Sequence, residues 1–347
     1  MNYILFDPPE IERFYPFTLT RPLGELRVFG GTLKELWEKH LGCQVSYLTR
    51  DYLSNLYPVV LKEDNIFLNP LEIFDNPNDH GIHFSYDGTH SIDSIRLFVK
   101  NNTKSTVCKN LFDILSDKYI AFNHQSFVSN IDLKKSSLMN DDKGAIYVEE
   151  DVEIMEGAMI RGPVYIGKGS VIKMGAKIYG PTVIGPYCKV GGEVSNCIFL
   201  GFSNKSHDGF LGHSIIGEWC NIGAGTNSSN LKNDYGSVKM WNYLDEKFTD
   251  SGRQFLGLYM GDHSKCAIST TFNTGTTIGV NCNVFGAGFP RNFIPSFSWG
   301  GSQGIKIYDF VKALSVAEKV MARRGLQLSR EYIKMLRIVY DMEIRKT

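Results

Sequence analysis

Aliphatic residues recur at every sixth position through the middle of the chain. Isoleucine or valine occupies seven consecutive hexad positions: Ile154, Ile160, Ile166, Ile172, Ile178, Ile184 and Val190. A compact side chain follows four residues after each, as at Ala158, Ser170 and Ala176. An α-helix of 3.6 residues per turn cannot keep a six-residue repeat on one face. The pattern predicts a parallel β-helix, in which three hexads form one triangular coil.

Two interruptions divide the hexad repeat. The pattern resumes at Ile216 and Ile222, and again from Met260 to Val284. The first interruption, 196–215, contains His207 and His213, and the second covers 227–257. Insertions into a solenoid map to loops and often carry function. We therefore expect both segments to be loops and to hold functional residues.

The segments that flank the repeat predict ordinary helices and strands. YILFD predicts a strand, TLKELWEKHLG an amphipathic helix ended by Gly42, and CQVSYLT a second strand, which together indicate a small α/β unit with a parallel sheet. PRNFIPSFSWGG predicts an aromatic loop, and two helices are expected over 306–324, ended by Gly325, and 329–345. The predicted domains are 1–140, 141–290 and 291–347.

Composition narrows the classes of partner. Lysine plus arginine and aspartate plus glutamate both number 37, so the formal net charge is zero, which argues against bulk binding to nucleic acid or anionic membranes. No apolar run is long enough to span a membrane, and the N-terminus lacks the pattern of a signal peptide. Seven cysteines without a CxxC pair predict a reduced, cytoplasmic protein whose cysteines are packing residues.

The glycine-rich stretch after His207 carries a specific resemblance. His207 is followed by the run LGHSIIGEWCNIGAGT and then by Asn230. This arrangement resembles the bifunctional UDP-N-acetylglucosamine pyrophosphorylase/glucosamine-1-phosphate N-acetyltransferase family, in which a histidine precedes GDxxIGxNVNIGAGT and an asparagine. FTLTRPLGELR, GAKIYGPTVIGPYCKVGGEV, GDHSKC and FPRNFIPSFSWGG resemble a shortened bacterial branch of that family. The resemblance implies a left-handed β-helix, a reduced nucleotidyltransferase-like domain before it, and a homotrimer with acyl sites between subunits.

The resemblance also implies roles for residues in and after the first interruption. His207 corresponds to the acetyltransferase base, which suits an imidazole, and Asn230 to a residue at the acetyl-transfer site. Lys232 or Lys239 would hold the sugar phosphate. Ser264 and Arg291 are candidates for binding acetyl-CoA, although Arg291 suits equally well the capping of the solenoid end. His213 occupies the position of an acidic residue of the family and is expected to be a surface side chain.

The N-terminal domain departs from the nucleotidyltransferase pattern. The glycine-rich loop LAAGxGxRM, which wraps a nucleoside triphosphate, is absent here. Arg21 and Arg27 stand in its place as candidate triphosphate ligands, with ion pairs to Glu10, Glu12 or Glu25 as the alternative. Asn69, in IFLNPLEIF, is the remaining match to a nucleotide-binding segment. No ligand for Mg²⁺ is identifiable, so the metal site is unknown.

These observations favour one function and leave others open. The expected reaction is acetyl transfer from acetyl-CoA to an amino-sugar 1-phosphate, with His207 as general base. The alternatives are a sugar-1-phosphate nucleotidyltransferase that uses UTP or another nucleoside triphosphate with Mg²⁺, and a non-catalytic binder of sugar nucleotides. A γ-type carbonic anhydrase shares the fold and binds zinc through three histidines. His207, His213 and His263 suit it poorly, because the first two occupy equivalent positions on successive faces and point in different directions.

Overall fold

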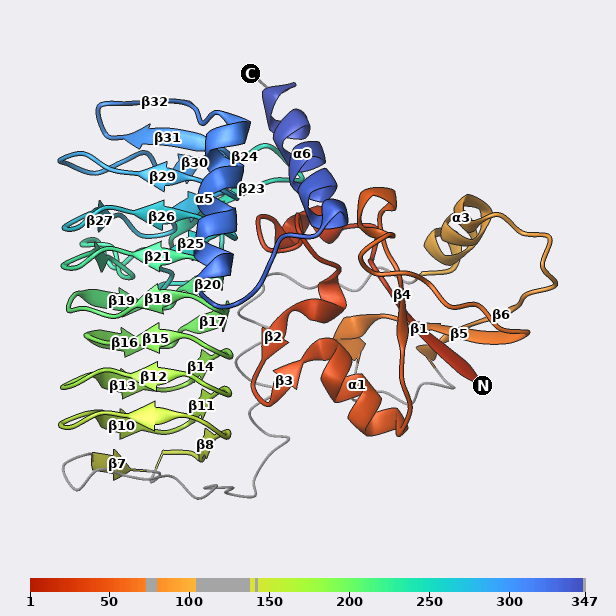
Figure 1. Ribbon diagram of the computed structural model, residues 1–347, viewed down its shortest axis with the longest axis horizontal. Coiled ribbons are helices and arrows are strands. Elements are labelled where there is room, and N and C mark those ends of the chain that lie inside the picture. The colour runs from red at the N-terminus through yellow and green to blue at the C-terminus, as the bar shows by residue number, and fades with distance from the viewer. Residues whose placement is uncertain (73–79, 104–137, 141–142, 346–347) are drawn as a thin grey trace.

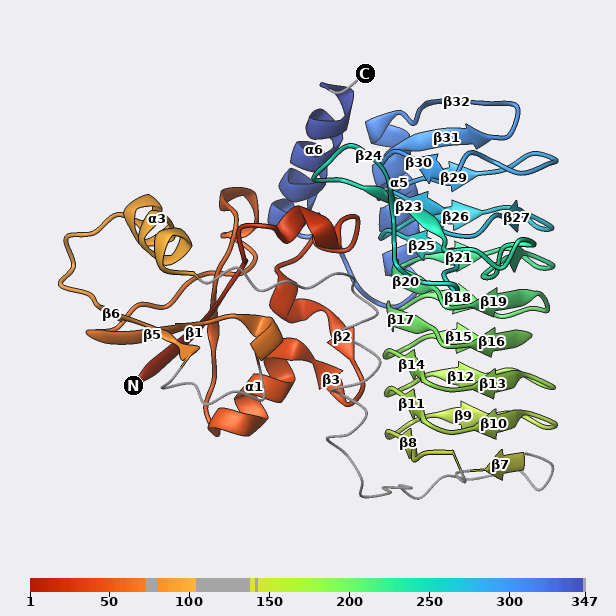
Figure 2. The ribbon, with the colours of Figure 1, turned by 180° about the vertical axis from the view of Figure 1, so that it is seen from behind.

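The computed structural model describes residues 1–72, 80–103, 138–140 and 143–345. A tall stack of coils forms one side of the molecule, and an α/β domain packs against it (Figures 1 and 2). Two C-terminal helices lie beside the upper coils, between the stack and the α/β domain (Figure 1). The chain therefore consists of a solenoid with a domain docked along one of its sides.

The solenoid is a triangular prism with three parallel sheets as its faces, visited in the order I, II, III. Face I consists of β7 (Leu138–Asn140), β10 (Met159–Arg161), β13 (Lys177–Tyr179), β16 (Glu193–Ser195), β19 (Phe210–Gly212), β22 (Asn227–Ser228) and β27 (Thr271–Phe272). Face II consists of β8 (Ile146–Val148), β11 (Val164–Ile166), β14 (Thr182–Ile184), β17 (Ile198–Gly201), β20 (Ile215–Glu218), β25 (Tyr259–Met260), β28 (Thr277–Ile278) and β30 (Phe293–Ile294). Face III consists of β9 (Glu153–Ile154), β12 (Val171–Ile172), β15 (Lys189–Val190), β18 (Asn204–Lys205), β21 (Asn221–Ile222), β26 (Lys265–Cys266), β29 (Asn283–Val284) and β31 (Ser298–Gly301), and β32 (Gly304–Ile307) pairs antiparallel to β31.

The hexad residues stack inside the prism as the repeat predicts. Every aliphatic hexad residue from Ile154 to Val190 is buried in a strand, and coils pair residue on residue. Ile172, for example, pairs with Ile154 on one side and Val190 on the other. The predicted left-handed parallel β-helix is thereby confirmed, because inward side chains can form continuous columns only when successive coils stay in register.

The first interruption is not a loop, and this prediction was wrong. Residues 196–215 contain β17, β18 and β19 and form part of a coil of the solenoid. The coil is contracted: Ile172 pairs with Val190, 18 residues on, but Val190 pairs with Lys205, 15 residues on. Shortened corners and a lysine in the inward position hid the repeat from a search for evenly spaced aliphatic residues.

The second interruption does leave the solenoid, as predicted. The chain departs after β22 and forms the hairpin of β23 (Lys239–Asn242) and β24 (Lys247–Asp250). It returns beside its own exit, where Leu256 N donates to Asn230 O. Trp241 of the hairpin stacks on Phe293, with ring centroids 4.1 Å apart, which holds the hairpin against the upper coils.

The N-terminal domain is the α/β unit expected from the sequence. Its sheet has the order β4 (Ser46–Leu48), β1 (Asn2–Phe6), β5 (Asp64–Leu68), β6 (Ile82–Ser85), with β1 parallel to both neighbours. A capping box at Thr32 begins helix α1 (Leu33–Leu41), and Gly42 ends it with φ 67°. The other elements are η1 (Ile11–Phe14), η2 (Leu23–Glu25), β2 (Arg27–Val28), β3 (Gly31–Thr32), η3 (Asp51–Leu53), η4 (Pro70–Glu72) and α3 (Ile92–Asn102).

Outward side chains of face II join this domain to the solenoid. Tyr165, Val183 and Ile198 belong to one buried cluster with Phe29 and Trp37 of the N-terminal domain. Face II is thus covered, and the edge between faces III and I, which lies opposite, points away from the domain. The same arrangement is visible in Figure 1, where the loops beside β10, β13 and β16 project to the far side.

The C-terminal segment partly differs from the prediction. The expected aromatic loop contains β30 and β31, which form the last coil of the solenoid, so the repeat extends beyond residue 290. The two helices are confirmed as α5 (Phe310–Ala322) and α6 (Arg330–Ile344), and Gly325 (φ 71°) follows the first. Phe310 and Leu336 pack with Leu19 and Leu53 of the N-terminal domain.

Removing one inward side chain should destabilise the solenoid strongly. Ile172→Ala leaves a void in a column where Ile172 is fully buried, and such changes cost about 2–5 kcal/mol. Urea unfolding followed by circular dichroism measures the loss. Val311→Ala on α5, where the side chain is 70% exposed, is the control and should change the midpoint little; equal effects from both substitutions would contradict the packing argument.

Candidate functional site

His207 lies at the edge between faces III and I. It follows β18 in a corner that leads to β19, and its side chain is exposed. Its carbonyl oxygen accepts a hydrogen bond from Lys205 Nζ at 2.7 Å. Because this edge is opposite the docked N-terminal domain, the His207 imidazole is open to a molecule that approaches from outside.

His213 and Asn230 lie together at the next edge, between faces I and II. Asn230 Nδ2 is 2.9 Å from His213 Nδ1, and the His213 ring stacks on Phe255 at 5.2 Å. His213 is half-buried at the root of the hairpin insertion, which corrects the expectation of a surface side chain. Within one chain, Asn230 therefore contacts His213, while the strand β19 separates it from His207.

The surroundings of His213 favour its neutral form. Burial, followed by the positive charge of Arg253, lowers the pKa of His213 to about 4. An amide nitrogen can only donate, so Nδ1 of the neutral ring accepts the hydrogen bond from Asn230. Such a ring is a weak proton acceptor near neutral pH.

The two lysines predicted to hold a sugar phosphate occupy the hairpin insertion. Lys232 forms an ion pair with Asp234 at 2.9 Å. Lys239 is exposed at the start of β23, opposite Asp250 in the hairpin. The insertion therefore places both cations above the edge that carries Asn230.

The two residues expected to bind acetyl-CoA have different environments. Ser264 is completely buried; its hydroxyl donates to Gly279 O at 2.6 Å and accepts from Cys282 N at 2.9 Å. Both hydrogen bonds join neighbouring coils. Because the Ser264 hydroxyl is buried and already has a donor and an acceptor, it is not available to bind acetyl-CoA, which corrects the expected role. Arg291 is exposed and borders a cavity of about 800 Å³ between the last coil and α6.

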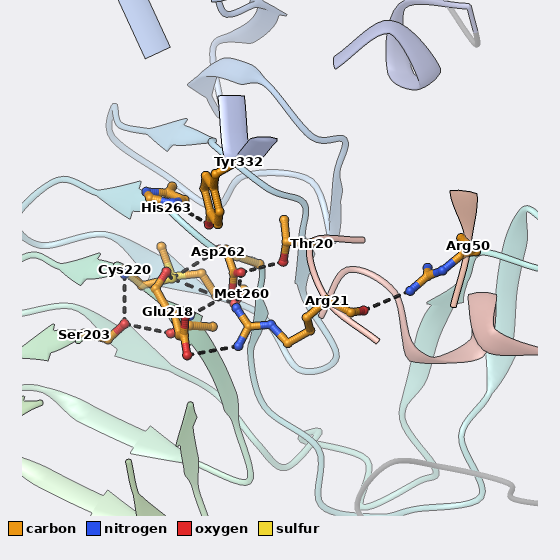
Figure 3. Close-up of polar contacts among 12 residues, drawn as sticks. Thr20, Arg21, Arg50, Ser203, Glu218, Cys220, Met260, Asp262, His263 and Tyr332 are labelled. Atoms are coloured by element: carbon orange, nitrogen blue, oxygen red, sulfur yellow. Dashed lines mark hydrogen bonds and ion pairs between the residues drawn. The ribbon is translucent and has the colours of Figure 1, made fainter. Parts of the chain in front are cut away.

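Arg21 makes a buried contact between the two domains, which is shown in Figure 3. Its guanidinium pairs with Glu218 at 3.1 Å and with Asp262, and Asp262 also accepts from Thr20 Oγ1 at 2.6 Å. Arg21 is only 5% exposed, and both carboxylates belong to the solenoid. The structure therefore gives Arg21 an interdomain role instead of a nucleotide-binding one, and its partners differ from the glutamates considered in the sequence.

Arg27 also lies at the domain interface. Its guanidinium is 3.8 Å from Glu35 Oε2, and its side chain is largely buried. Glu35 belongs to the capping box of α1, and it was not among the glutamates considered in the sequence. Neither Arg21 nor Arg27 lines the cavities at the ends of β1, β4 and β5 in the N-terminal domain.

A polar edge of the N-terminal sheet was missed by the sequence reasoning, apart from Asn69. Asn69 follows β5 and lines a cavity of about 320 Å³ together with Glu72 and His80. Arg50 and Asp7, which follow β4 and β1, form an ion pair at 3.2 Å and line a neighbouring cavity of about 240 Å³. Ligands of open α/β sheets bind at the carboxyl ends of the strands, so the position of Arg50 directly after a predicted strand was the available signal.

The three histidines considered for zinc occupy three different edges. His207 lies between faces III and I, His213 between I and II, and His263 between II and III, where its Nε2 is 3.0 Å from the Tyr332 hydroxyl. Among the described residues, no group of three or more histidine, cysteine, aspartate or glutamate side chains is arranged around a common metal position.

Comparison with known proteins supports the resemblance found in the sequence. Residues 3–102 match the family model described as sugar nucleotidyl transferase. The chain is 37% identical over 145 residues to the bifunctional sugar-1-phosphate nucleotidylyltransferase/acetyltransferase of Sulfurisphaera tokodaii, which covers 41% of this chain and 36% of the relative. It is 38% identical over 90 residues to the bifunctional protein GlmU of Methanocaldococcus jannaschii, which covers 26% of this chain and 21% of the relative. The predicted resemblance to this family is confirmed.

The matches are partial in length. The aligned region spans only about a third of the first curated relative and about a fifth of the second. Among solved structures, UDP-N-acetylglucosamine acyltransferase from Campylobacter jejuni is similar over 59% of this chain and 94% of its own, with 15% identity and a TM-score of 0.27. No described helix has the length and apolar character to cross a membrane.

Truncating Arg21 should destabilise the protein through the interface. Arg21→Met leaves Asp262 and Glu218 without their cation, and breaking a buried ion pair costs about 3–5 kcal/mol. Urea unfolding measures the change. Lys168→Met, which removes an exposed ion pair with Glu150, is the control and should leave the midpoint nearly unchanged. A stability of Arg21→Met equal to that of the control would contradict this role.

His213 should make stability depend on pH. Its folded pKa, about 4, is below the ordinary value of about 6.5, so acid protonates the unfolded chain first. Wild-type stability should fall as pH drops from about 6.5 to about 4. His213→Gln lacks this linkage, so its stability relative to wild type should improve over that window and stay constant from pH 7 to 8. Parallel curves for the two proteins would refute the assignment.

Proposed function

We propose that the solenoid transfers an acetyl group from acetyl-CoA to the amine of an amino-sugar 1-phosphate. The observation that carries the proposal is the exposed His207 at the open edge, in the position that the motif assigns to the base. The relative from Sulfurisphaera tokodaii, which is a bifunctional sugar-1-phosphate nucleotidylyltransferase/acetyltransferase, supports the reaction class. His213, the other histidine of this stretch, is held neutral and half-buried and suits the task less well.

The reaction requires the removal of one proton. The neutral amine of the sugar attacks the thioester carbon while the His207 imidazole accepts a proton from the nitrogen. Collapse of the tetrahedral intermediate breaks the carbon–sulfur bond, and the thiolate of CoA leaves and takes up the proton from His207. Lys232 and Lys239 supply positive charge for the sugar phosphate, and Arg291 does the same for phosphates of CoA beside the cavity of about 800 Å³.

A homotrimer is part of this proposal. His207 and Asn230 lie at different edges of one prism, with the strand β19 between them. Closed threefold assembly would set the III–I edge of one copy against an edge of its neighbour. Asn230 of a neighbouring copy would then orient the amine beside His207.

A second candidate function belongs to the N-terminal domain. The family model over residues 3–102 and the cavities at the carboxyl ends of β1, β4 and β5 favour transfer of a nucleotide from UTP or another nucleoside triphosphate to a sugar 1-phosphate. Asn69 and Arg50 are the residues at this edge that suit a nucleotide. Glu72 and Asn69 would supply oxygen ligands to Mg²⁺, which prefers one or two carboxylates together with substrate phosphates and water.

We place the protein in the cytoplasm. Every cysteine that the structure describes is free, and five of the six are buried in the solenoid. Burial raises the pKa of the Cys188 thiol to about 12, so it behaves as an apolar packing residue. Free packing cysteines suit a reducing compartment.

Two parallel assays test the proposal. One supplies glucosamine 1-phosphate and acetyl-CoA and follows free thiol; the other supplies N-acetylglucosamine 1-phosphate, UTP and Mg²⁺ and follows pyrophosphate. His207→Ala should lower kcat for thiol release by about 100-fold or more, because general-base catalysis contributes about that much, and should leave the oligomer unchanged.

The controls separate the candidate functions. His40→Asn changes an exposed histidine of α1 and should retain full activity. Release of pyrophosphate without release of thiol would show that the N-terminal domain is active and would contradict acetyl transfer by the solenoid. Failure of both reactions, with binding of a sugar nucleotide retained, would identify a non-catalytic binder.

A further inference from the structure

A lysine occupies the interior of the solenoid directly before the His207 corner. Lys205 stands in the inward column of face III, between Val190 below and Ile222 above. It is 1% exposed, and among the described residues of this column it is the one with a charged side chain. Its ammonium donates to two backbone carbonyl oxygens, those of Gly191 at 3.2 Å and His207 at 2.7 Å.

The position is costly for a cation. Burying an ammonium group in apolar surroundings is unfavourable, and an aliphatic side chain of similar volume would be at least as stable there. Burial lowers the pKa of Lys205 to about 8. Stabilisation of the solenoid interior therefore does not explain why a lysine occupies this position. The carbonyl oxygens that its ammonium group binds do offer an explanation.

The corner that Lys205 reaches differs from regular corners. In regular corners the residue with positive φ is the third after the inward residue, as at Gly157 and Gly175, whereas after Lys205 it is the fourth, Gly209. The corner below is short, because Val190 and Val194 are both inward residues only four positions apart. The His207 corner thus packs on an irregular neighbour.

This shift changes which carbonyl oxygen receives a backbone hydrogen bond. In regular corners the carbonyl oxygen of the second residue after the inward position accepts a hydrogen bond from a backbone N–H of the next coil. Glu156 O, for example, accepts from Gly175 N at 3.1 Å. Above Lys205, Gly225 N donates at 2.9 Å to the third residue, Asp208. The second residue is His207, and its carbonyl oxygen receives the Lys205 ammonium in place of a backbone N–H.

We propose that Lys205 is a positioning residue, which fixes the irregular corner from inside the solenoid so that the His207 imidazole keeps one orientation at the open edge. The catalytic part of this inference rests on the proposed function of His207. Misplacement of a reacting group by about 1 Å can cost about 100-fold in rate. Loss of the ammonium should therefore act on turnover far more than on stability or substrate binding.

The test replaces Lys205 by an apolar side chain. Lys205→Met keeps the length of the side chain, and Lys205→Ile repeats the aliphatic residue of neighbouring coils and serves if the methionine variant folds poorly. We expect kcat for thiol release to fall about 10- to 100-fold, the KM values to stay within about twofold, and the urea midpoint to be unchanged or higher. Amide exchange of the peptide 206–212 should become at least about tenfold faster.

The chain contains a matched control. Lys265 is half-buried, has a pKa lowered to about 8 chiefly by desolvation, and donates to the carbonyl oxygen of a histidine two residues away, His263, at 2.7 Å. It serves the edge between faces II and III. Lys265→Met should therefore alter neither kcat nor exchange of 206–212.

Each outcome bears on the inference. Unchanged exchange of 206–212 in Lys205→Met overturns it whether or not the protein is active. Faster exchange with unchanged kcat shows that His207 does not need the positioning and overturns it too. If the wild-type protein transfers no acetyl group, faster exchange of 206–212 in Lys205→Met still supports the role of Lys205 in fixing the corner. The exchange measurement thus distinguishes this role from the proposed acetyl transfer.

Discussion

Stacking of inward side chains in the prism is the constraint on which the rest of the structure depends. Each coil must place its aliphatic residues above those of the coil below, because otherwise the columns lose their contacts and neighbouring backbones lose their hydrogen bonds. Where this rule holds, the corners repeat with the same spacing. Where the sequence bends it, at the contracted coil and at the hairpin insertion, the structure presents His207, His213 and Asn230. The candidate functional residues thus lie where the coil spacing departs locally from the regular repeat.

Docking of the N-terminal domain decides which edges stay open. Face II is buried under this domain, and the Arg21 contact to Glu218 and Asp262 locks the two parts together. The edge with His207 points the other way, while the polar edge with Asn69 and Arg50 belongs to the docked domain. The two candidate sites therefore face different solvent regions, and any product shared between them would have to leave one site before reaching the other.

Arg21 and Lys205 are both buried cations, but their roles differ. The Arg21 cluster joins charges of opposite sign across an interface, where each satisfies the other. Lys205 instead meets only neutral carbonyl oxygens in its hydrogen bonds, within a lumen that an aliphatic residue would fill. The first arrangement is explained by cohesion of two domains. The buried Lys205 is explained by the corner that it holds, because its ammonium group connects the solenoid interior to the backbone of His207 at the surface.

The sequence by itself determined the repeat, because a six-residue period is compatible with one way of burying its aliphatic residues. It also determined the α/β unit, the Gly42 and Gly325 helix ends and the place where the chain leaves the solenoid at 227–257, all of which depend on local sequence patterns. Only the tertiary structure showed that 196–215 is a coil, since an inward lysine breaks the pattern without breaking the register. Likewise, only folding could pair Arg21 with Asp262 and bury Ser264, because those partners lie far away in the chain or in the next coil and leave no periodic signal.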